Sequence, residues 1–102
     1  MASDVRIERS NYNGQRTLAM VSNGRSFIET VRTLKAEMDH IIADGVAEMV
    51  AVYGFEDVTQ AQAFYDRING FVSYLDDPGG ALITLSEYMT KQDELLYPTV
   101  GI

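Results

Sequence analysis

The sequence predicts a mainly α-helical domain built on an antiparallel helical hairpin over about 26–53 and 59–76. Apolar residues recur at spacings of three and four along both ranges, which places an apolar stripe on one side of a helix. Each range begins with residues that cap helices, and five residues join them, a length typical of helical hairpins. The chain has 102 residues, 46% of them hydrophobic, which indicates a single domain with one core.

The first segment, 1–25, is expected to form an extended arm or a β-hairpin. Val5 and Ile7 alternate with polar neighbours, and an apolar run over 17–21 follows the turn-forming pair Asn13–Gly14. Because two strands alone are marginally stable in water, we expect this segment to pack on the body of the domain or on a partner.

The first helix is predicted to begin at Ser26, which forms a capping box with Glu29. Gly45 interrupts the stretch that follows, and a glycine in a helix interior costs about 1 kcal/mol relative to alanine. Gly45 therefore marks a kink, a point of close packing or a break. Since the apolar stripe continues past it to Tyr53, one helix over 26–53 is favoured.

The second helix is predicted over 59–76, with Thr59 and Asp57 as competing N-caps. The pair Asn69–Gly70 favours a turn and is the weak point of this helix.

Two interpretations of the following segment stay open. In the first, 81–96 forms a third helix that ends before Pro98. In the second, 71–75 and 81–85 are strands of a β-hairpin around an Asp-Pro-Gly-Gly turn, and the fold is α+β with hairpins at both ends. The expected organisation is an N-terminal arm or β-hairpin, a helical body and a C-terminal tail: 1–25, 26–96 and 97–102.

Charge and composition exclude several classes of function. The net charge is −7, and it divides into +3 over residues 1–35 and −10 over 36–102. Because phosphate backbones repel an acidic surface, direct nucleic-acid binding is not expected. The absence of cysteine excludes disulfides and thiolate metal sites, and no apolar stretch is long enough for a membrane span or a secretory signal. We therefore expect a soluble protein of the cytoplasm or, if the chain is viral, of the virion.

One cluster has the spacing of metal ligands. Glu37 and His40 form an E-x-x-H unit, as in di-iron helical bundles, and Asp44 lies one turn beyond His40. Such sites normally use two of these units, and this chain has a single histidine, so we expect no metal and no cofactor. No nucleophile and base can be paired at sequence level, and an enzyme is not expected.

Aromatic and basic residues indicate protein interfaces. Tyrosines that lie off the main apolar stripes or in the terminal segments, together with the arginines of the first segment, are the predicted interface residues. They are Arg6, Arg9, Tyr12, Arg16, Tyr65, Tyr74 and Tyr97.

These patterns favour a non-enzymatic structural protein that assembles with copies of itself, as a homo-oligomer, or with other proteins. Small acidic helical chains of this type are common among virion components such as connector, adaptor and capsid-associated proteins. Two alternatives remain. One is an acidic inhibitor or antitoxin-like protein that occludes a basic site on a nucleic-acid enzyme, and the other is a metal-binding helical oligomer.

Overall fold

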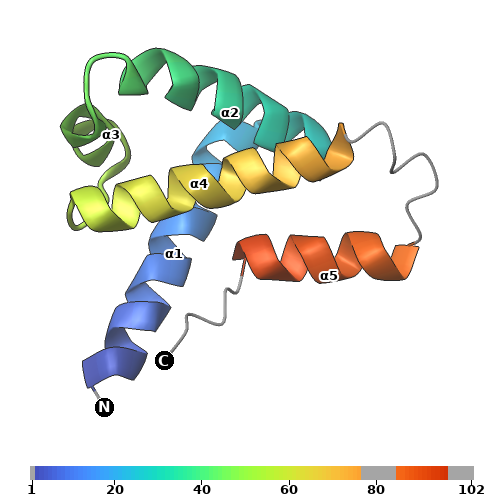
Figure 1. The fold of residues 1–102 in the computed structure, drawn as a ribbon, viewed down its shortest axis with the longest axis horizontal. Helices are drawn as coiled ribbons and strands as arrows, with labels where there is room; N and C mark the ends of the chain where they lie inside the picture. The colour runs from blue at the N-terminus through green and yellow to red at the C-terminus, as the bar shows by residue number, and fades with distance from the viewer. Residues whose placement is uncertain (1, 77–84, 97–102) are drawn as a thin grey trace.

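The computed structural model of the chain describes the main chain of residues 2–76 and 85–96, with side chains over 12–76 and 86–96. Within these residues there are five helices and no strand, so the mainly helical class is confirmed. The helices are α1 (Ala2–Ser22), α2 (Phe27–Ile42), α3 (Val46–Tyr53), α4 (Val58–Leu75) and α5 (Leu85–Leu96) (Figure 1).

Helices α2 and α4 run in opposite directions, and α3 lies between them in sequence and at one end of the pair (Figure 1). Helix α1 passes behind this pair, and its N-terminal half projects past the other helices in this view, whereas α5 lies along the second half of α4. Among the side chains of α1 described over 12–22, those of Asn13, Thr17 and Leu18 are buried against the body.

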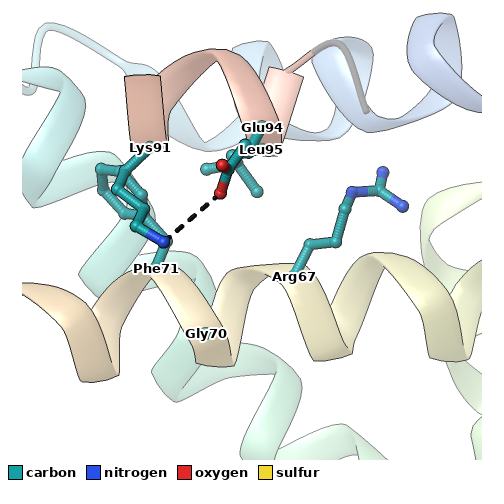
Figure 2. Close-up of a pocket in the computed structure, with 6 residues that line it drawn as sticks. All are labelled: Arg67, Gly70, Phe71, Lys91, Glu94 and Leu95. Atoms are coloured by element: carbon teal, nitrogen blue, oxygen red, sulfur yellow. Dashed lines mark ion pairs between the residues drawn. The ribbon is translucent and has the colours of Figure 1, made fainter. Parts of the chain in front are cut away.

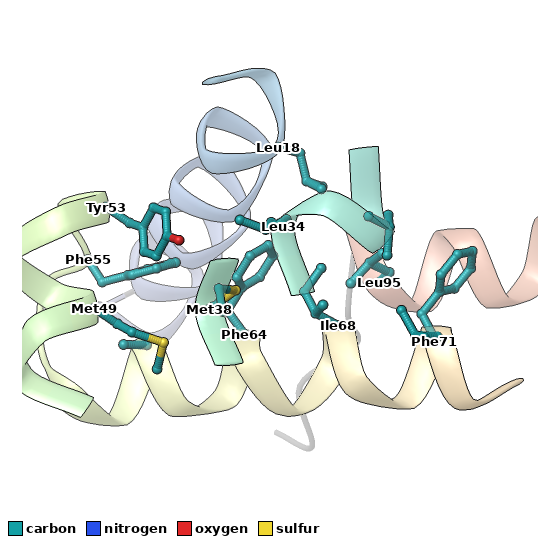
Figure 3. Packing of buried hydrophobic residues seen from close by; sticks show 13 residues of the cluster. Leu18, Leu34, Met38, Met49, Tyr53, Phe55, Phe64, Ile68, Phe71 and Leu95 are labelled. Atoms are coloured by element: carbon teal, nitrogen blue, oxygen red, sulfur yellow. The ribbon is translucent and has the colours of Figure 1, made fainter. Parts of the chain in front are cut away.

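All five helices contribute to one core (Figure 3). Phe64 of α4 lies near its centre and is 1% exposed, and its ring lies 5.5 Å from that of Phe55. The two ends of the core are closed by aromatic contacts, Tyr53 with Phe55 and Phe27 with Phe71. Full burial of such large apolar side chains contributes roughly 1.5–3 kcal/mol each. Among the described residues, the largest fully buried apolar side chains are Val31, Leu34, Met38, Met49, Phe64 and Ile68.

The expected arm or β-hairpin over 1–25 is wrong, because the chain forms helix α1 there. The pair Asn13–Gly14 lies inside the helix and faces the core. The Asn13 side chain donates a hydrogen bond to the Gln60 side chain at 2.8 Å, and a Cβ on Gly14 would lie 2.8 Å from Phe64 Cε1. Gly14 therefore allows α1 to approach α4 closely, and no turn forms. The pair Asn23–Gly24, by contrast, follows the end of α1 and has positive φ at both residues.

The single helix expected over 26–53 is also wrong. Ser26 caps α2 as predicted and accepts a hydrogen bond from the Glu29 amide at 3.2 Å. The helix ends at Ile42, and Gly45 adopts a φ of 113°, a conformation that glycine tolerates and other residues rarely adopt. The change of direction at Gly45 starts α3, whose Met49 and Tyr53 are buried in the core.

The second predicted helix corresponds to α4, and its N-cap is Asp57, which accepts a hydrogen bond from the Gln60 amide at 2.8 Å. Thr59 lies inside the helix. Asn69–Gly70 does not interrupt α4, so the strand expected over 71–75 in the β-hairpin alternative is wrong. The third predicted helix is present from Leu85 to Leu96; the Asp-Pro-Gly-Gly turn and the tail over 97–102 lie outside the described residues.

Candidate protein interface

The side chain of Arg16, a predicted interface residue, forms hydrogen bonds within the chain. Its guanidinium donates hydrogen bonds to the carbonyl oxygens of Tyr53 and Gly54, at 2.7 and 2.9 Å. These carbonyls belong to the C-terminal end of α3, where backbone acceptors have no partner inside the helix. Arg16 of α1 thus caps α3 and fixes it to the body. Tyr12, one turn earlier, is 64% exposed, and the Arg16 guanidinium lies 5.8 Å from the centre of its ring.

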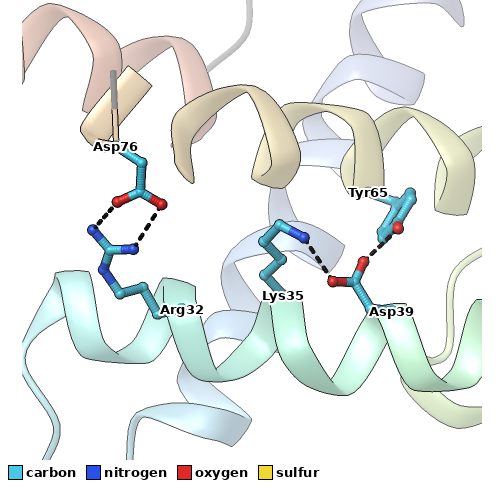
Figure 4. A network of polar contacts seen from close by, with 5 residues as sticks. All are labelled: Arg32, Lys35, Asp39, Tyr65 and Asp76. Atoms are coloured by element: carbon cyan, nitrogen blue, oxygen red, sulfur yellow. Dashed lines mark hydrogen bonds and ion pairs between the residues drawn. The ribbon is translucent and has the colours of Figure 1, made fainter. Parts of the chain in front are cut away.

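Tyr65 belongs to a polar network that joins α2 to α4 (Figure 4). Its hydroxyl donates to the carboxylate of Asp39, which also accepts from Lys35 at 2.6 Å. These two bonds lower the pKa of Asp39, the Lys35 bond more strongly. At the other end of the same helix pair, Arg32 and Asp76 form a bidentate ion pair at 2.8 and 3.1 Å.

Tyr74 connects α4 to α5. Its hydroxyl lies 3.5 Å from the Glu87 carboxylate, and the Lys91 ammonium lies 5.3 Å from the centre of its ring. The side chains of the remaining predicted interface residues, Arg6, Arg9 and Tyr97, lie outside the described part of the chain.

The three candidate metal ligands do not converge on a common site. Glu37 accepts a hydrogen bond from the Tyr53 hydroxyl at 2.6 Å, whereas His40 and Asp44 are exposed. Burial of Tyr53, and then its bond to the Glu37 carboxylate, raises the pKa of this tyrosine. No group of three or more His, Asp or Glu residues within the described ranges is placed to hold a metal ion.

The feature that the sequence reasoning missed is the outer surface of α3. Met49 and Tyr53 face the core, but Ala47, Ala51 and Val52 are exposed on the same helix. Because residues four apart in a helix are neighbours, the positions 47, 48, 51 and 52 form one continuous strip. Glu48 is the only charged residue of this helix. The signal in the sequence is that this helix is apolar around its circumference except at Glu48, which is typical of a helix with contacts on more than one side.

Two other elements extend this strip. Met20 of α1 is 60% exposed and lines a shallow groove with Val52, which is 48% exposed. Val58, the first residue of α4, is 50% exposed and lines a second open groove with Val46 of α3 and Ala63. We use the name α3 surface for these exposed apolar residues: Met20, Ala47, Ala51, Val52 and Val58.

Comparisons with protein-family models, curated proteins and solved structures find no match for this chain. Of the helices in the described ranges, none has the length and apolar character needed to cross a bilayer.

Carboxylates border the α3 surface. Asp44 precedes α3, and Glu48 lies in the first turn of α3 beside Ala47 and Ala51. Both are exposed, and no cation in the described residues pairs with either. Asp57 adds a third carboxylate beside Val58. The surface therefore combines apolar side chains with an acidic border. Shallow open grooves of this kind suit contact with another protein, whereas small ligands bind mainly in enclosed concave sites.

Proposed function

We propose that this chain is a non-enzymatic assembly protein that acts through protein–protein association, and that the α3 surface is its main contact. The proposal depends on one observation: a helix with a single charged residue buries Met49 and Tyr53 in the core but leaves Ala47, Ala51 and Val52 exposed. Exposed apolar residues that gather in one place, with a polar border, are typical of protein-binding surfaces.

The proposed partner is a second copy of this chain or another protein of the same assembly. Two properties of the surface determine how association between copies depends on salt. The net charge of −7 makes copies repel one another, and the carboxylates of Asp44 and Glu48 increase this repulsion at the α3 surface. Burial of Met20 and Val52 favours contact and does not weaken with salt. Self-association should therefore increase as salt screens the charges.

The test is light scattering on the purified chain over a range of protein and salt concentrations. We expect oligomers whose fraction rises with salt. Val52→Asp should weaken association at least about 30-fold, because roughly 2 kcal/mol or more is lost when an unpaired polar group is buried at an interface. Ser73→Asp adds the same charge at an exposed position near the opposite end of α4 and should associate like the parent chain.

A chain that stays monomeric at all concentrations and salt levels would contradict self-association. Equal effects of Val52→Asp and Ser73→Asp would exclude the α3 surface as the contact. Both variants place an aspartate at an exposed position in the last turn of a helix, so each should lower the melting temperature slightly and by a similar amount.

The carboxylates at the start of α3 favour a second candidate function, an acidic inhibitor of a nucleic-acid enzyme. Asp44 and Glu48 would then occupy a basic site of the enzyme in place of phosphates. The two functions respond to salt in opposite ways: affinity for a basic partner falls steeply as salt rises, whereas self-association increases. Asp44→Asn with Glu48→Gln would abolish inhibition and strengthen self-association.

A further inference from the structure

A cleft between α4 and α5, away from the α3 surface, contains a cation that has no hydrogen-bond or ion-pair partner among the described side chains. The cleft has a volume of about 200 Å³ and is lined by Arg67, Gly70 and Phe71 of α4 and by Lys91, Glu94 and Leu95 of α5. Figure 2 shows Arg67 rising from α4 at one end of the cleft, and Lys91 reaching from α5 at the other end, where it pairs with Glu94.

Arg67 differs from the other cations. Among the Lys and Arg side chains over 12–76 and 86–96, it is the one that makes neither a hydrogen bond nor an ion pair; its Nε is buried without an acceptor. Its guanidinium lies 5.4 Å from the centre of the Phe64 ring. Burial lowers the pKa of Arg67, the direction expected when no anion offsets the loss of water. None of the carboxylates over 12–76 and 86–96 pairs with Arg67, which leaves the guanidinium available to an external one.

Gly70 has no packing role within the described residues. It lies in the interior of α4, where glycine costs about 1 kcal/mol relative to alanine. A Cβ built on Gly70 would meet no atom within 4 Å, whereas one built on Gly14 would meet Phe64 at 2.8 Å. Close helix packing thus accounts for Gly14 but not for Gly70. Gly70 lines the cleft, so a large side chain at this position would narrow it.

We propose that this cleft binds a carboxylate group attached to an apolar body. A guanidinium pairs with a carboxylate through two parallel hydrogen bonds, and Arg67 has donors free to do so. Arg67, Lys91 and Glu94 together give the lining a charge of +1, which one carboxylate neutralises, and Phe71 and Leu95 supply apolar contact. The Glu94 carboxylate disfavours a doubly charged phosphate. The carboxylate comes either from a small acid or from a second copy of the chain.

The test is a titration of the full chain with sodium isovalerate, followed by amide chemical shifts, with sodium chloride at equal ionic strength as the reference. We expect saturable shifts at Gly70, Phe71 and Leu95, with a dissociation constant in the millimolar range. Arg67→Met and Gly70→Leu should abolish them. Arg32→Met should retain them, because Arg32 pairs with Asp76 outside the cleft. Gly70→Leu keeps the test valid if Arg67→Met does not fold, since leucine is a better helix former than glycine.

Two further arms define the ligand. Glu94→Gln should tighten isovalerate binding roughly threefold by removing a nearby like charge, and inorganic phosphate should bind the parent chain more weakly than isovalerate. If a second copy supplies the carboxylate, dilution without isovalerate will shift the same amides in the parent chain but not in Arg67→Met. If a small acid is the ligand, dilution will leave them unchanged.

Shifts that do not saturate, or that persist in both Arg67→Met and Gly70→Leu, would overturn the proposal, as would an absence of shifts in both the isovalerate and dilution arms. These outcomes are independent of the α3 surface, because no residue of that surface lines the cleft.

Discussion

Two glycines in helix interiors should respond to alanine in opposite directions. Replacing either Gly14 or Gly70 with alanine gains about 1 kcal/mol of helix propensity. At Gly70 the added Cβ meets no atom within 4 Å, so Gly70→Ala should raise the free energy of unfolding by nearly this amount. At Gly14 the Cβ would lie 2.8 Å from Phe64 Cε1 and 3.0 Å from Cδ1, both in a buried ring.

Overpacking of a well-packed core costs about 1–3 kcal/mol, which equals or exceeds the gain in helix propensity. Gly14→Ala should therefore be neutral or destabilise the fold by up to about 2 kcal/mol, and the two variants should differ by about 1–3 kcal/mol. Urea unfolding followed by far-UV circular dichroism measures both values. If Gly14→Ala stabilises the chain as much as Gly70→Ala does, α1 does not pack against Phe64 and the placement of this helix is refuted.

Three further predictions concern the polar contacts. Arg16→Met removes the cap on the carbonyls of Tyr53 and Gly54 and should lower the free energy of unfolding by about 1–2 kcal/mol in urea titrations; Arg25→Met, which removes a bond to a carbonyl of its own helix, should cost less. Arg32 lowers the pKa of Asp76, so this pair should stabilise the fold above the unfolded pKa of aspartate. The contribution is lost as pH falls through the lower folded pKa. Asp76→Asn should therefore reduce the fall in melting temperature at acid pH. The pKa of Tyr53 is raised, so its contribution should be complete below about pH 10 and lost as pH rises further, because the unfolded chain ionises first. Tyr53→Phe should reduce the fall in melting temperature above about pH 10, and an unchanged fall would contradict the burial of the hydroxyl.

The sequence alone predicts the structure correctly where a helix depends only on residues that are close to one another in the chain. The cap at Ser26 needs only the amide of Glu29, and the apolar stripe of α4 is regular enough to continue through Asn69–Gly70. The start of α2 and both ends of α4 could therefore be predicted within a few residues, whereas the end of α2 could not. The choice between Asp57 and Thr59 as N-cap was open, since each has the right side chain.

The errors arose where a distant contact decides the local structure. Asn13–Gly14 has the composition of a turn, but its role is set by Gln60 and Phe64, which lie far along the chain. Gly45 allowed three interpretations, and the break is favoured because it lets α3 pack Met49 and Tyr53 into the core. Neither contact can be deduced from the spacing of nearby residues.

The candidate sites were less predictable than the fold. Arg16 was expected at an interface because of its charge, yet it bonds to backbone carbonyls of α3 within the same chain. The α3 surface has a signal in the sequence, a short stretch with one charged residue, but the prediction of one helix over 26–53 includes this stretch in its apolar stripe. The availability of Arg67 depends on which acids lie near it in three dimensions, and composition carries no information on that point.

Molar mass in solution tests the central proposal most directly. Light scattering of the 11.4 kDa chain should give a mass above that of the monomer, and one that increases with salt. Val52→Asp should return the mass to that of the monomer while Ser73→Asp leaves it unchanged. A monomeric parent chain, or a Val52→Asp variant that assembles as well as the parent, would contradict association through the α3 surface.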